Sequence, residues 1–313
     1  MTGSDRTIAS GARVKVLLST YNGAPFLREL LDSLLTQSYG NVVIDVRDDG
    51  SVDDTNRILD EYAARHPTIH TVRGENLGVI GSYFFLLNEA GDDFDFYSFC
   101  DHDDIWHPDK IRDAVTRLSS EDSDRPLLYC SRVEFVDEAM NRLGFSPIPR
   151  RIGFGNALVE NIAIGCTVVV NRKARELILS REPGRMIMHD WWFYLIVSAF
   201  GEVIYDEKPN IRYRQHSGNV IGGTPNMAVN VFRRLKVFMQ AGKELFMVSD
   251  QASEFENRYG PLLDRDGIML LSRFIGSKKS LLSRFRYSVT MDVWRQSVID
   301  TCMLRVLILL GWY

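Results

Sequence analysis

Short apolar runs alternate with longer amphipathic segments along the first third of the chain. The apolar runs predict strands over residues 14–20, 42–48, 68–74 and 94–101. Apolar residues at helical spacing predict helices over residues 26–38, 53–66, 78–91 and 107–118. This alternation predicts an α/β fold with a mixed, mostly parallel sheet, right-handed crossovers and flanking helices.

The pattern changes beyond residue 125. PLLYCSRVEFVD and CTVVVN predict strands of an added, partly antiparallel portion, whereas RKARELILS and DWWFYLIVSAFG predict helices. From about residue 226 we expect an entirely helical extension. Its last part mixes basic and large apolar residues, as in KKSLLSRFRY and MLRVLILLGWY. Such a segment fits either an interfacial helix on an anionic membrane or a helix packed on the protein body or a second subunit.

Four polar, glycine-rich or acidic loops follow the four predicted strands. In chain order they are YNG, DDGS, GENLG and DHDD. Ligands of parallel sheets bind beyond the carboxyl ends of the strands, so we expect these loops to meet at one rim. Their convergence is stronger evidence for a site than any one loop.

Composition limits the class of protein. The chain has 313 residues, 45% of them hydrophobic and 25% charged, which predicts a folded globular protein. A net charge of −4 argues against a nucleic-acid partner. No apolar signal segment and no run of apolar residues long enough to span a bilayer is present, so we expect a cytoplasmic protein. The four cysteines include no CxxC pair, which fits reduced thiols rather than a zinc site or disulfides.

Three carboxylates crowd the end of the fourth predicted strand, in SFCDHDDIWH. Asp101, Asp103 and Asp104 repel one another unless they are solvated or paired. Hard oxygen ligands at a strand end suit Mg²⁺ or Mn²⁺, which bridge to substrate phosphates. The motif alone predicts either a metal-dependent nucleotide or phosphate site, or a solvated acidic loop.

Two common nucleotide folds are poorly supported. No GxGxxG follows the first strand, and no GxxxxGK[ST] occurs in the chain. A nucleotide would therefore bind without a glycine-rich phosphate cradle. A divalent metal is then the natural counter-charge for a diphosphate.

Six motifs occur in an order that resembles a known family. They are STYNG (19–23), DDGSVDDT (48–55), ENLG (75–78), DHDDIWHPDKI (101–111), HDWW (189–192) and YRQHSGN (213–219). The set resembles family 2 glycosyltransferases of the GT-A fold, and most of all bacterial rhamnosyltransferase-like members that build cell-surface polysaccharide. The resemblance covers roughly residues 13–222, and the ordered set is specific although no single motif is.

The resemblance implies a nucleotide site on the first three loops. Ser19 and Tyr21 match positions that hold the nucleobase. Asp49, with or without Asp48, matches the carboxylate that accepts a hydrogen bond from the pyrimidine N3–H, and an acceptor-only carboxylate suits that donor. Arg73 is a weaker match for a contact to the base or ribose. Taken alone, DDGS also fits a turn and helix cap, and Arg73 also fits a surface arginine.

The acidic motif matches the DxD motif of the family. Asp101 would contact the ribose or the metal, and Asp103 would bind the Mn²⁺ or Mg²⁺ on the sugar diphosphate. His102 stands where relatives carry glutamine or alanine and receives no role. Asp104 would cap the following helix or meet the donor sugar. Trp106 would either line the sugar site or pack.

The HDWW motif matches the catalytic base of an inverting transfer, which deprotonates the acceptor hydroxyl. Asp190 matches that base, although His189 replaces the glutamate that usually precedes it. Asp190 also fits an N-cap of the following helix, and one carboxylate can do both. Trp191 or Trp192 would offer a ring face to the acceptor sugar.

In the last motif, His216 matches a histidine that ligates the metal or the diphosphate, and imidazole suits Mn²⁺ better than Mg²⁺. Arg214 would neutralise the leaving phosphates. Three glycines make the segment a candidate lid over bound donor: Gly218, Gly222 and Gly223.

Together these features predict a metal-dependent inverting glycosyltransferase, with a GT-A domain over residues 13–225 and a helical region over 226–313. The expected donor is a dTDP- or UDP-sugar, with dTDP-L-rhamnose first. The expected acceptor is a growing surface glycan, such as O-antigen, or a lipid-linked glycan. The helical region would contact the cytoplasmic face of the bacterial membrane or form a homo-oligomer. The alternatives are transfer of N-acetylglucosamine, galactose or glucose from UDP, a nucleotidyltransferase, or a nucleotide-sugar-binding assembly subunit without activity.

Overall fold

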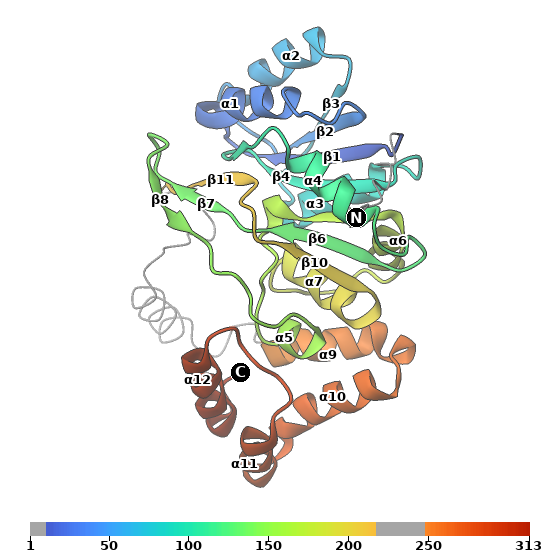
Figure 1. Ribbon diagram of the computed structural model, residues 1–313, viewed down its shortest axis with the longest axis vertical. Coiled ribbons are helices and arrows are strands. Elements are labelled where there is room, and N and C mark those ends of the chain that lie inside the picture. The colour runs from blue at the N-terminus through green and yellow to red at the C-terminus, as the bar shows by residue number, and fades with distance from the viewer. Residues whose placement is uncertain (1–10, 217–247) are drawn as a thin grey trace, which may run out of the picture. The chain divides into compact units, whose positions relative to one another are not determined.

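The structure is a computed structural model that describes residues 11–216 and 248–313 (Figure 1). These residues divide into two compact units that interleave along the chain. The first contains residues 11–147, 164–176 and 204–216, and the second contains residues 148–163, 177–203 and 248–313. The second unit therefore combines two segments from the middle of the chain with the C-terminal helices. The sequence, in contrast, predicts two domains that follow one another along the chain.

The main sheet has seven strands in the order β10-β6-β9-β4-β1-β2-β3. Their bounds are β1 Val14–Thr20, β2 Val42–Asp48, β3 Ile69–Arg73, β4 Phe96–Asp101, β6 Leu127–Ser131, β9 Val169–Asn171 and β10 Glu202–Asp206. β4, β1, β2 and β3 run parallel, whereas β9 runs antiparallel to both β4 and β6. This confirms the predicted mixed, mostly parallel sheet.

Helices of the first unit connect the parallel strands. They are α1 Ala24–Leu35, α2 Thr55–Arg65, α3 Gly78–Glu89 and α4 Lys110–Leu118, and α6 Arg172–Ser180 begins in this unit. α3 packs on β1 and β2, α4 packs on β6, and α1 packs on α2 (Figure 1). The apolar positions that predicted these elements are the ones that fill the core, for example Leu18 and Leu30.

A second, four-stranded sheet was only partly expected. It has the order β5-β11-β7-β8, with β5 Ile105–Trp106, β7 Glu134–Val136, β8 Arg142–Phe145 and β11 Ile211–Arg214. β11 runs antiparallel to β5 and parallel to β7. The pairing of β5 with β11 brings the chain just after DHDD beside the chain just before His216.

Within the described residues, the second unit is mainly helical. Its helices are α5 Phe154–Ala157, α7 His189–Phe200, α9 Val248–Tyr259, α10 Arg265–Gly276, α11 Leu281–Thr290 and α12 Val298–Leu310. Short 3₁₀ turns also occur in the chain: η1 Gly165–Thr167, η3 Gly260–Leu262 and η4 Ser277–Lys279. Among the described residues, no helix is both long and apolar enough to cross a membrane.

One stretch between α11 and α12 departs from the expected continuous helix. Residues 291–297 are not helical, because their polar groups bond to an earlier segment of the same unit. The indole Nε1 of Trp294 donates to the carbonyl of Arg151 at 3.2 Å, and the backbone N–H of Gln296 donates to Glu160 at 2.6 Å. Hydrogen bonds to residues far away in the sequence therefore override the local preference for a helix that the sequence pattern predicts.

Candidate active site

The strand register places the ends of three parallel strands at one edge of the sheet. In the pairing of β1 with its two neighbours, Ser19 lies opposite Asp101 and Thr20 lies opposite Asp48. The loops that follow these strands therefore start side by side. Since parallel sheets bind ligands at this edge, it is where a site is expected.

The imidazole of His216 meets the acidic motif directly. Its Nε2 lies 2.9 Å from Oδ2 of Asp103, and both side chains are largely buried. The β5–β11 pair brings the two residues together, since Ile105 pairs with Arg212. The ring of Phe26 from α1 packs against the imidazole, with 4.9 Å between ring centroids. A carboxylate and an imidazole thus face each other at the edge of the sheet.

The carboxylate of Asp101 lies at the end of β4 and is held by a tyrosine. The hydroxyl of Tyr83, on α3, lies 2.5 Å from Oδ1 of Asp101 and 2.8 Å from the carbonyl of Cys100. Burial and, to a smaller extent, the nearby charge of Asp103 together raise the pKa of Asp101 to about 6. An added cation would remove this penalty on the charged form.

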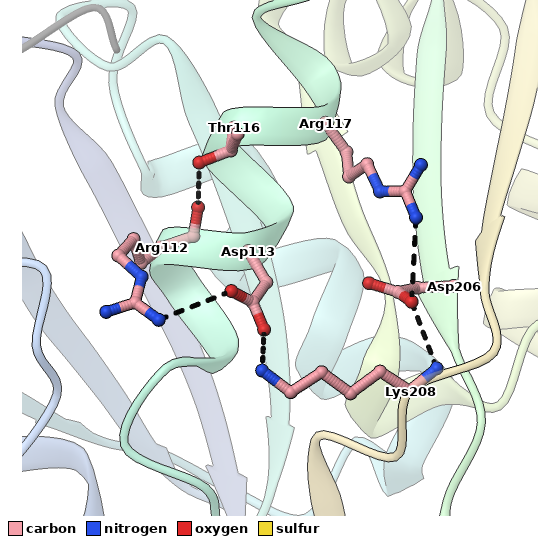
Figure 2. A pocket seen from close by; sticks show the side chains of 6 residues that line it. All are labelled: Arg112, Asp113, Thr116, Arg117, Asp206 and Lys208. Atoms are coloured by element: carbon pink, nitrogen blue, oxygen red, sulfur yellow. Dashed lines mark hydrogen bonds and ion pairs between the residues drawn. The ribbon is translucent and has the colours of Figure 1, made fainter. Parts of the chain in front are cut away.

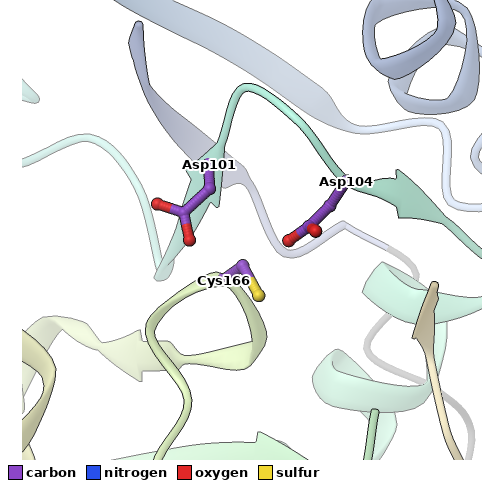
Figure 3. Close-up of side chains that lie close together, drawn as sticks. All are labelled: Asp101, Asp104 and Cys166. Carbon is purple, nitrogen blue, oxygen red and sulfur yellow. The ribbon is translucent and has the colours of Figure 1, made fainter. Parts of the chain in front are cut away.

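Asp104 lies beneath the turn and close to Asp101 and Cys166. Figure 3 shows these three side chains close together. One potential ligand atom from each lies within 4.8 Å of the others. Burial, followed by the charges of Asp103 and Asp101, raises the pKa of Asp104. Burial also raises the pKa of the Cys166 thiol, which keeps it protonated and a poor metal ligand.

Arg214 fastens the acidic turn to its surroundings. Its Nε donates to the carbonyl of Asp103 at 2.9 Å, and its backbone N–H donates to Oδ1 of Asp104 at 3.1 Å. Its remaining nitrogens donate to the carbonyl of Glu138 at 2.9 Å and to Oε2 of Glu29 at 2.5 Å. A contact from Arg214 to phosphate stays a prediction.

Asp49 binds the start of α3. Its carboxylate accepts hydrogen bonds from the backbone N–H groups of Leu77 at 2.8 Å and Gly78 at 2.9 Å, where the helix dipole favours a negative charge. The buried guanidinium of Arg47 forms an ion pair with the same carboxylate. The predicted contact between Asp49 and a nucleobase stays a prediction.

Asp48 is buried beside the same loop. Its Oδ2 accepts hydrogen bonds from the backbone N–H of Ser51 at 3.0 Å and from the amide of Asn56 at 3.1 Å. Its Oδ1 is also buried but accepts no hydrogen bond from any residue that the structure describes. Buried polar atoms are nearly always bonded, so this oxygen has the capacity to accept one from a ligand.

The other predicted nucleotide residues differ in exposure. Ser19 bonds to Ser82 through their hydroxyls at 2.7 Å, whereas Tyr21 is 46% exposed and leaves a ring face accessible. Arg73 lies on the surface and forms an ion pair with Asp60. Its side chain is half-exposed, and its predicted contact to the base or ribose is not tested.

Trp106 packs in the core rather than lining an open site. It is 2% exposed, and the ammonium of Lys110 lies 3.4 Å from the centroid of its ring. The ammonium also donates to the hydroxyl of Ser98 at 2.9 Å. Of the two roles that the sequence allowed for Trp106, the structure shows packing.

The candidate base, Asp190, lies in the first turn of α7 in the second unit. The N-cap of this helix is Met188, so Asp190 is not the cap. Its Oδ1 accepts a hydrogen bond from the backbone N–H of Trp191 at 2.6 Å. Beside it, His189 is buried, and burial lowers the pKa of its imidazole to about 3, so His189 is neutral.

The two tryptophans of HDWW have different surroundings within the second unit. Trp191 is partly exposed, and its indole donates to the carbonyl of Ala157 at 2.7 Å. Trp192 is fully buried and packs edge-on against Phe255 and Tyr259. Packing therefore replaces the acceptor contact that the sequence suggested for Trp192, because it has no accessible ring face.

A surface depression of about 520 Å³ lies away from these residues, between α4 and the end of β10 (Figure 2). Its lining residues are Arg112, Asp113, Thr116, Arg117, Asp206 and Lys208. Each cation faces a carboxylate, for example Lys208 and Asp113 at 2.6 Å. Three cations and two carboxylates line the depression and pair with one another, and it holds none of the predicted site residues.

Two structural partners of the site were not identified from the sequence. Tyr83 appeared only as one apolar position in a helix, and Arg47 only as one residue of a strand. Their bonds to Asp101 and Asp49 depend on strand order, which no local pattern reports. The candidate lid glycines at 218, 222 and 223 lie outside the described residues.

Comparisons with known proteins identify the family of the chain. Residues 15–174 match the family model described as Glycosyl transferase family 2. The chain is 28% identical over 222 residues to dTDP-rhamnosyl transferase RfbG of Shigella flexneri, which covers 66% of this chain and 73% of that protein. It is 24% identical over 269 residues to the uncharacterized glycosyltransferase RT0329 of Rickettsia typhi, covering 81% of this chain and 80% of that protein.

Among solved structures, the fold is similar to that of S. aureus TarS 1-349 in complex with UDP-GlcNAc. The TM-score is 0.55 at 18% identity, and the match covers 96% of this chain and 87% of that chain. At this identity the likeness concerns the fold alone.

Proposed function

The chain belongs to glycosyl transferase family 2, and from this premise we propose that it transfers a sugar from a nucleoside diphosphate donor to a glycan acceptor with inversion at the anomeric carbon. The first candidate donor is dTDP-L-rhamnose. Its support is the similarity to dTDP-rhamnosyl transferase RfbG, a protein that is named for this donor class.

One observation carries the proposal. Asp103 and His216, from distant parts of the chain, meet at 2.9 Å at the edge of the sheet where Asp101 also ends its strand. Two carboxylates and an imidazole at the carboxyl end of parallel strands form a site suited to a metal-bound diphosphate.

The residues present fit a divalent ion such as Mn²⁺ or Mg²⁺. Asp103 and His216 would hold it, with Asp101 at the ribose or the ion. Asp101 is partly buried, which disfavours its charged form, and a cation would offset this effect. When bound, the ion would stabilise negative charge on the leaving diphosphate.

The nucleotide would be read by the loops after β1, β2 and β3. Asp48 offers a buried acceptor oxygen, and Tyr21 offers an exposed ring. Ser19, Asp49 and Arg73 complete the proposed set. Asp49 also holds the backbone N–H groups at the start of α3, so it would orient the loop as well as bind a ligand.

Within the second unit, Asp190 is the proposed base. A carboxylate Oδ atom would accept the proton of the acceptor hydroxyl as that oxygen attacks the anomeric carbon. Its neighbour His189 is neutral, so it adds no positive charge that would stabilise the carboxylate and weaken it as a base. Trp191 and Asp104 would border the acceptor and donor sugars, and Arg214 the diphosphate.

The proposed acceptor is a growing cell-surface glycan, free or linked to a lipid carrier. Such an acceptor would place the enzyme at the cytoplasmic face of the bacterial membrane. The division into a GT-A domain over residues 13–225 and a helical region over 226–313 is part of this proposal.

A thermal-shift screen tests the donor class. The protein would be melted with dTDP, UDP, GDP or ADP, each with and without Mn²⁺ or Mg²⁺, since a ligand of the folded state raises the melting temperature. We expect a metal-dependent shift that is largest for dTDP. A larger shift with UDP would move the donor to a UDP-sugar, and no shift with any nucleotide would contradict the proposal.

A further inference from the structure

Each of the last two helices exposes apolar side chains along one of its sides. Those on α11 are Leu281, Leu282, Phe285 and Val289, and those on α12 are Val298, Ile299, Val306 and Leu310. Each is between 48% and 71% exposed, although large apolar residues normally fill a core. In each helix they recur at a spacing of about four residues, so they form a single stripe. We call these eight residues the α11–α12 face.

The α11–α12 face is opposite the side through which each helix packs. On α12, Ile308 is buried and lies two residues, or about 200° around the helix, from both Val306 and Leu310. On α11, Tyr287 is buried and stands in the same relation to Phe285 and Val289. The exposed apolar residues are therefore separate from those through which each helix packs in the second unit.

The two helices form an antiparallel pair. The guanidinium of Arg305, in α12, donates to the carbonyl of Ser288 near the end of α11. At the other end of the pair, Gly311 lies against the guanidinium of Arg284. These contacts hold the two stripes on one rigid element.

Cations accompany the apolar face. Residues 277–313 contain six basic residues, Lys278, Lys279, Arg284, Arg286, Arg295 and Arg305, against two acidic ones, Asp292 and Asp300. The whole chain, by contrast, has a net charge of −4. Lys279 and Arg286 are exposed and form no ion pair with any residue that the structure describes. They lie just before and within α11, beside its apolar stripe.

We propose that the α11–α12 face docks on an anionic lipid bilayer. The apolar side chains would enter the boundary between headgroups and acyl chains, and Lys279 and Arg286 would meet lipid phosphates. The exposed indole of Trp312, just beyond α12, suits the same interfacial depth. The basic surplus supplies the charge complementarity that identifies this partner.

A second copy of the chain fits the face less well. A two-fold contact would place the same surface against itself, so cations such as Arg286 would gather at one interface. Residues 277–313 contain only two acidic residues that could offset them, and one of these, Asp292, already forms an ion pair with Arg273. Anionic lipids remove this repulsion, whereas self-association increases it.

The chain supplies its own probe for the test. Cys302 is exposed on α12 between Ile299 and Val306, whereas Cys100, Cys130 and Cys166 are buried. Labelling the folded protein with an environment-sensitive thiol fluorophore therefore reports on the face. Vesicles of phosphatidylglycerol and phosphatidylcholine in equal parts should shift the emission to the blue, at an affinity about tenfold or more above that for phosphatidylcholine alone.

Unlabelled variants complete the test by co-sedimentation with the same vesicles. Phe285→Asp and Arg286→Glu should each weaken binding by about tenfold or more. The matched controls, Leu143→Asp and Arg65→Glu, alter exposed residues of the first unit and should bind as the wild type does. All four should keep the wild-type melting temperature and nucleotide binding, which separates this inference from the proposed function.

Two results would overturn the inference. One is vesicle binding that is equal with and without phosphatidylglycerol, or equal in Phe285→Asp and Leu143→Asp. The other is the absence of vesicle binding together with a concentration-dependent dimer that Phe285→Asp abolishes, which would assign the face to a second copy.

Discussion

Nε2 of His216 lies 2.9 Å from Oδ2 of Asp103, although the two residues are 113 positions apart in the chain. The contact depends on the short antiparallel pair of β5 and β11. It joins the two motifs for which the family resemblance implies the same ligand, a divalent ion on a diphosphate.

Removing either member of this pair should remove metal-dependent transfer. For Asp103→Asn and His216→Gln we expect turnover to fall by about a hundredfold or more, because charge stabilisation at the diphosphate is lost. Because both residues would hold one ion, the double variant should lose little more than either single variant. Initial rates over a Mn²⁺ titration measure this, with Asp109→Asn, an exposed acid of the same motif, as the control. Additive losses would contradict a shared ion.

Asp190→Asn should separate binding from chemistry. The amide retains the shape of the side chain but cannot take the acceptor proton, so turnover should fall by about 10²- to 10⁴-fold. The dissociation constant of the nucleotide should stay near its wild-type value. Comparing turnover with calorimetric nucleotide binding makes the test, and near wild-type turnover would assign the base to another residue.

Tyr83→Phe should destabilise the first unit. The variant removes a hydroxyl that lies 2.5 Å from Asp101 and leaves a buried carboxylate with one bond fewer. We expect the free energy of unfolding to fall by about 1–3 kcal/mol. Urea denaturation measures it, with the exposed Tyr21→Phe expected to change stability by less than about 0.5 kcal/mol. Equal stability of Tyr83→Phe and Tyr21→Phe would show that the hydrogen bond between Tyr83 and Asp101 does not stabilise the fold.

His189 should make stability depend on pH. Burial lowers the pKa of its imidazole to about 3, whereas the unfolded chain takes up the proton near the ordinary value of 6.5. The contribution of His189 to the free energy of unfolding is therefore complete above pH 6.5. As the pH falls from 6.5 toward 3, this contribution is lost by up to about 1.4 kcal/mol per pH unit. Urea denaturation at several pH values measures this slope. His189→Gln should show a shallower slope over the same range, and identical slopes would contradict a neutral buried imidazole.

Much of the first unit could be predicted from the sequence, because its signals are local. The run over 14–20 forms β1 with the expected bounds, and the run over 42–48 forms β2. Each strand is apolar, buried and closed by a polar loop, so pattern and structure coincide. The parallel register then follows from the helices between strands.

The rest depends on distant partners. β5 has two residues and β11 has four, which is too short for a pattern to identify. Arg47 and Tyr83 acquire their roles only when neighbouring strands and helices are in place. The sequence leaves the ring of Trp192 as a candidate for an acceptor contact. Within the second unit, however, Phe255 and Tyr259 pack against this ring.

The most direct test of the central claim needs no acceptor. Calorimetric titration of dTDP and UDP into the wild type, Asp103→Asn and Asp190→Asn, with and without Mn²⁺, asks whether the predicted residues form the donor site. We predict binding that requires Mn²⁺ in the wild type, persists in Asp190→Asn and is lost in Asp103→Asn. Nucleotide binding that is equal without metal, or unchanged in Asp103→Asn, would contradict the account.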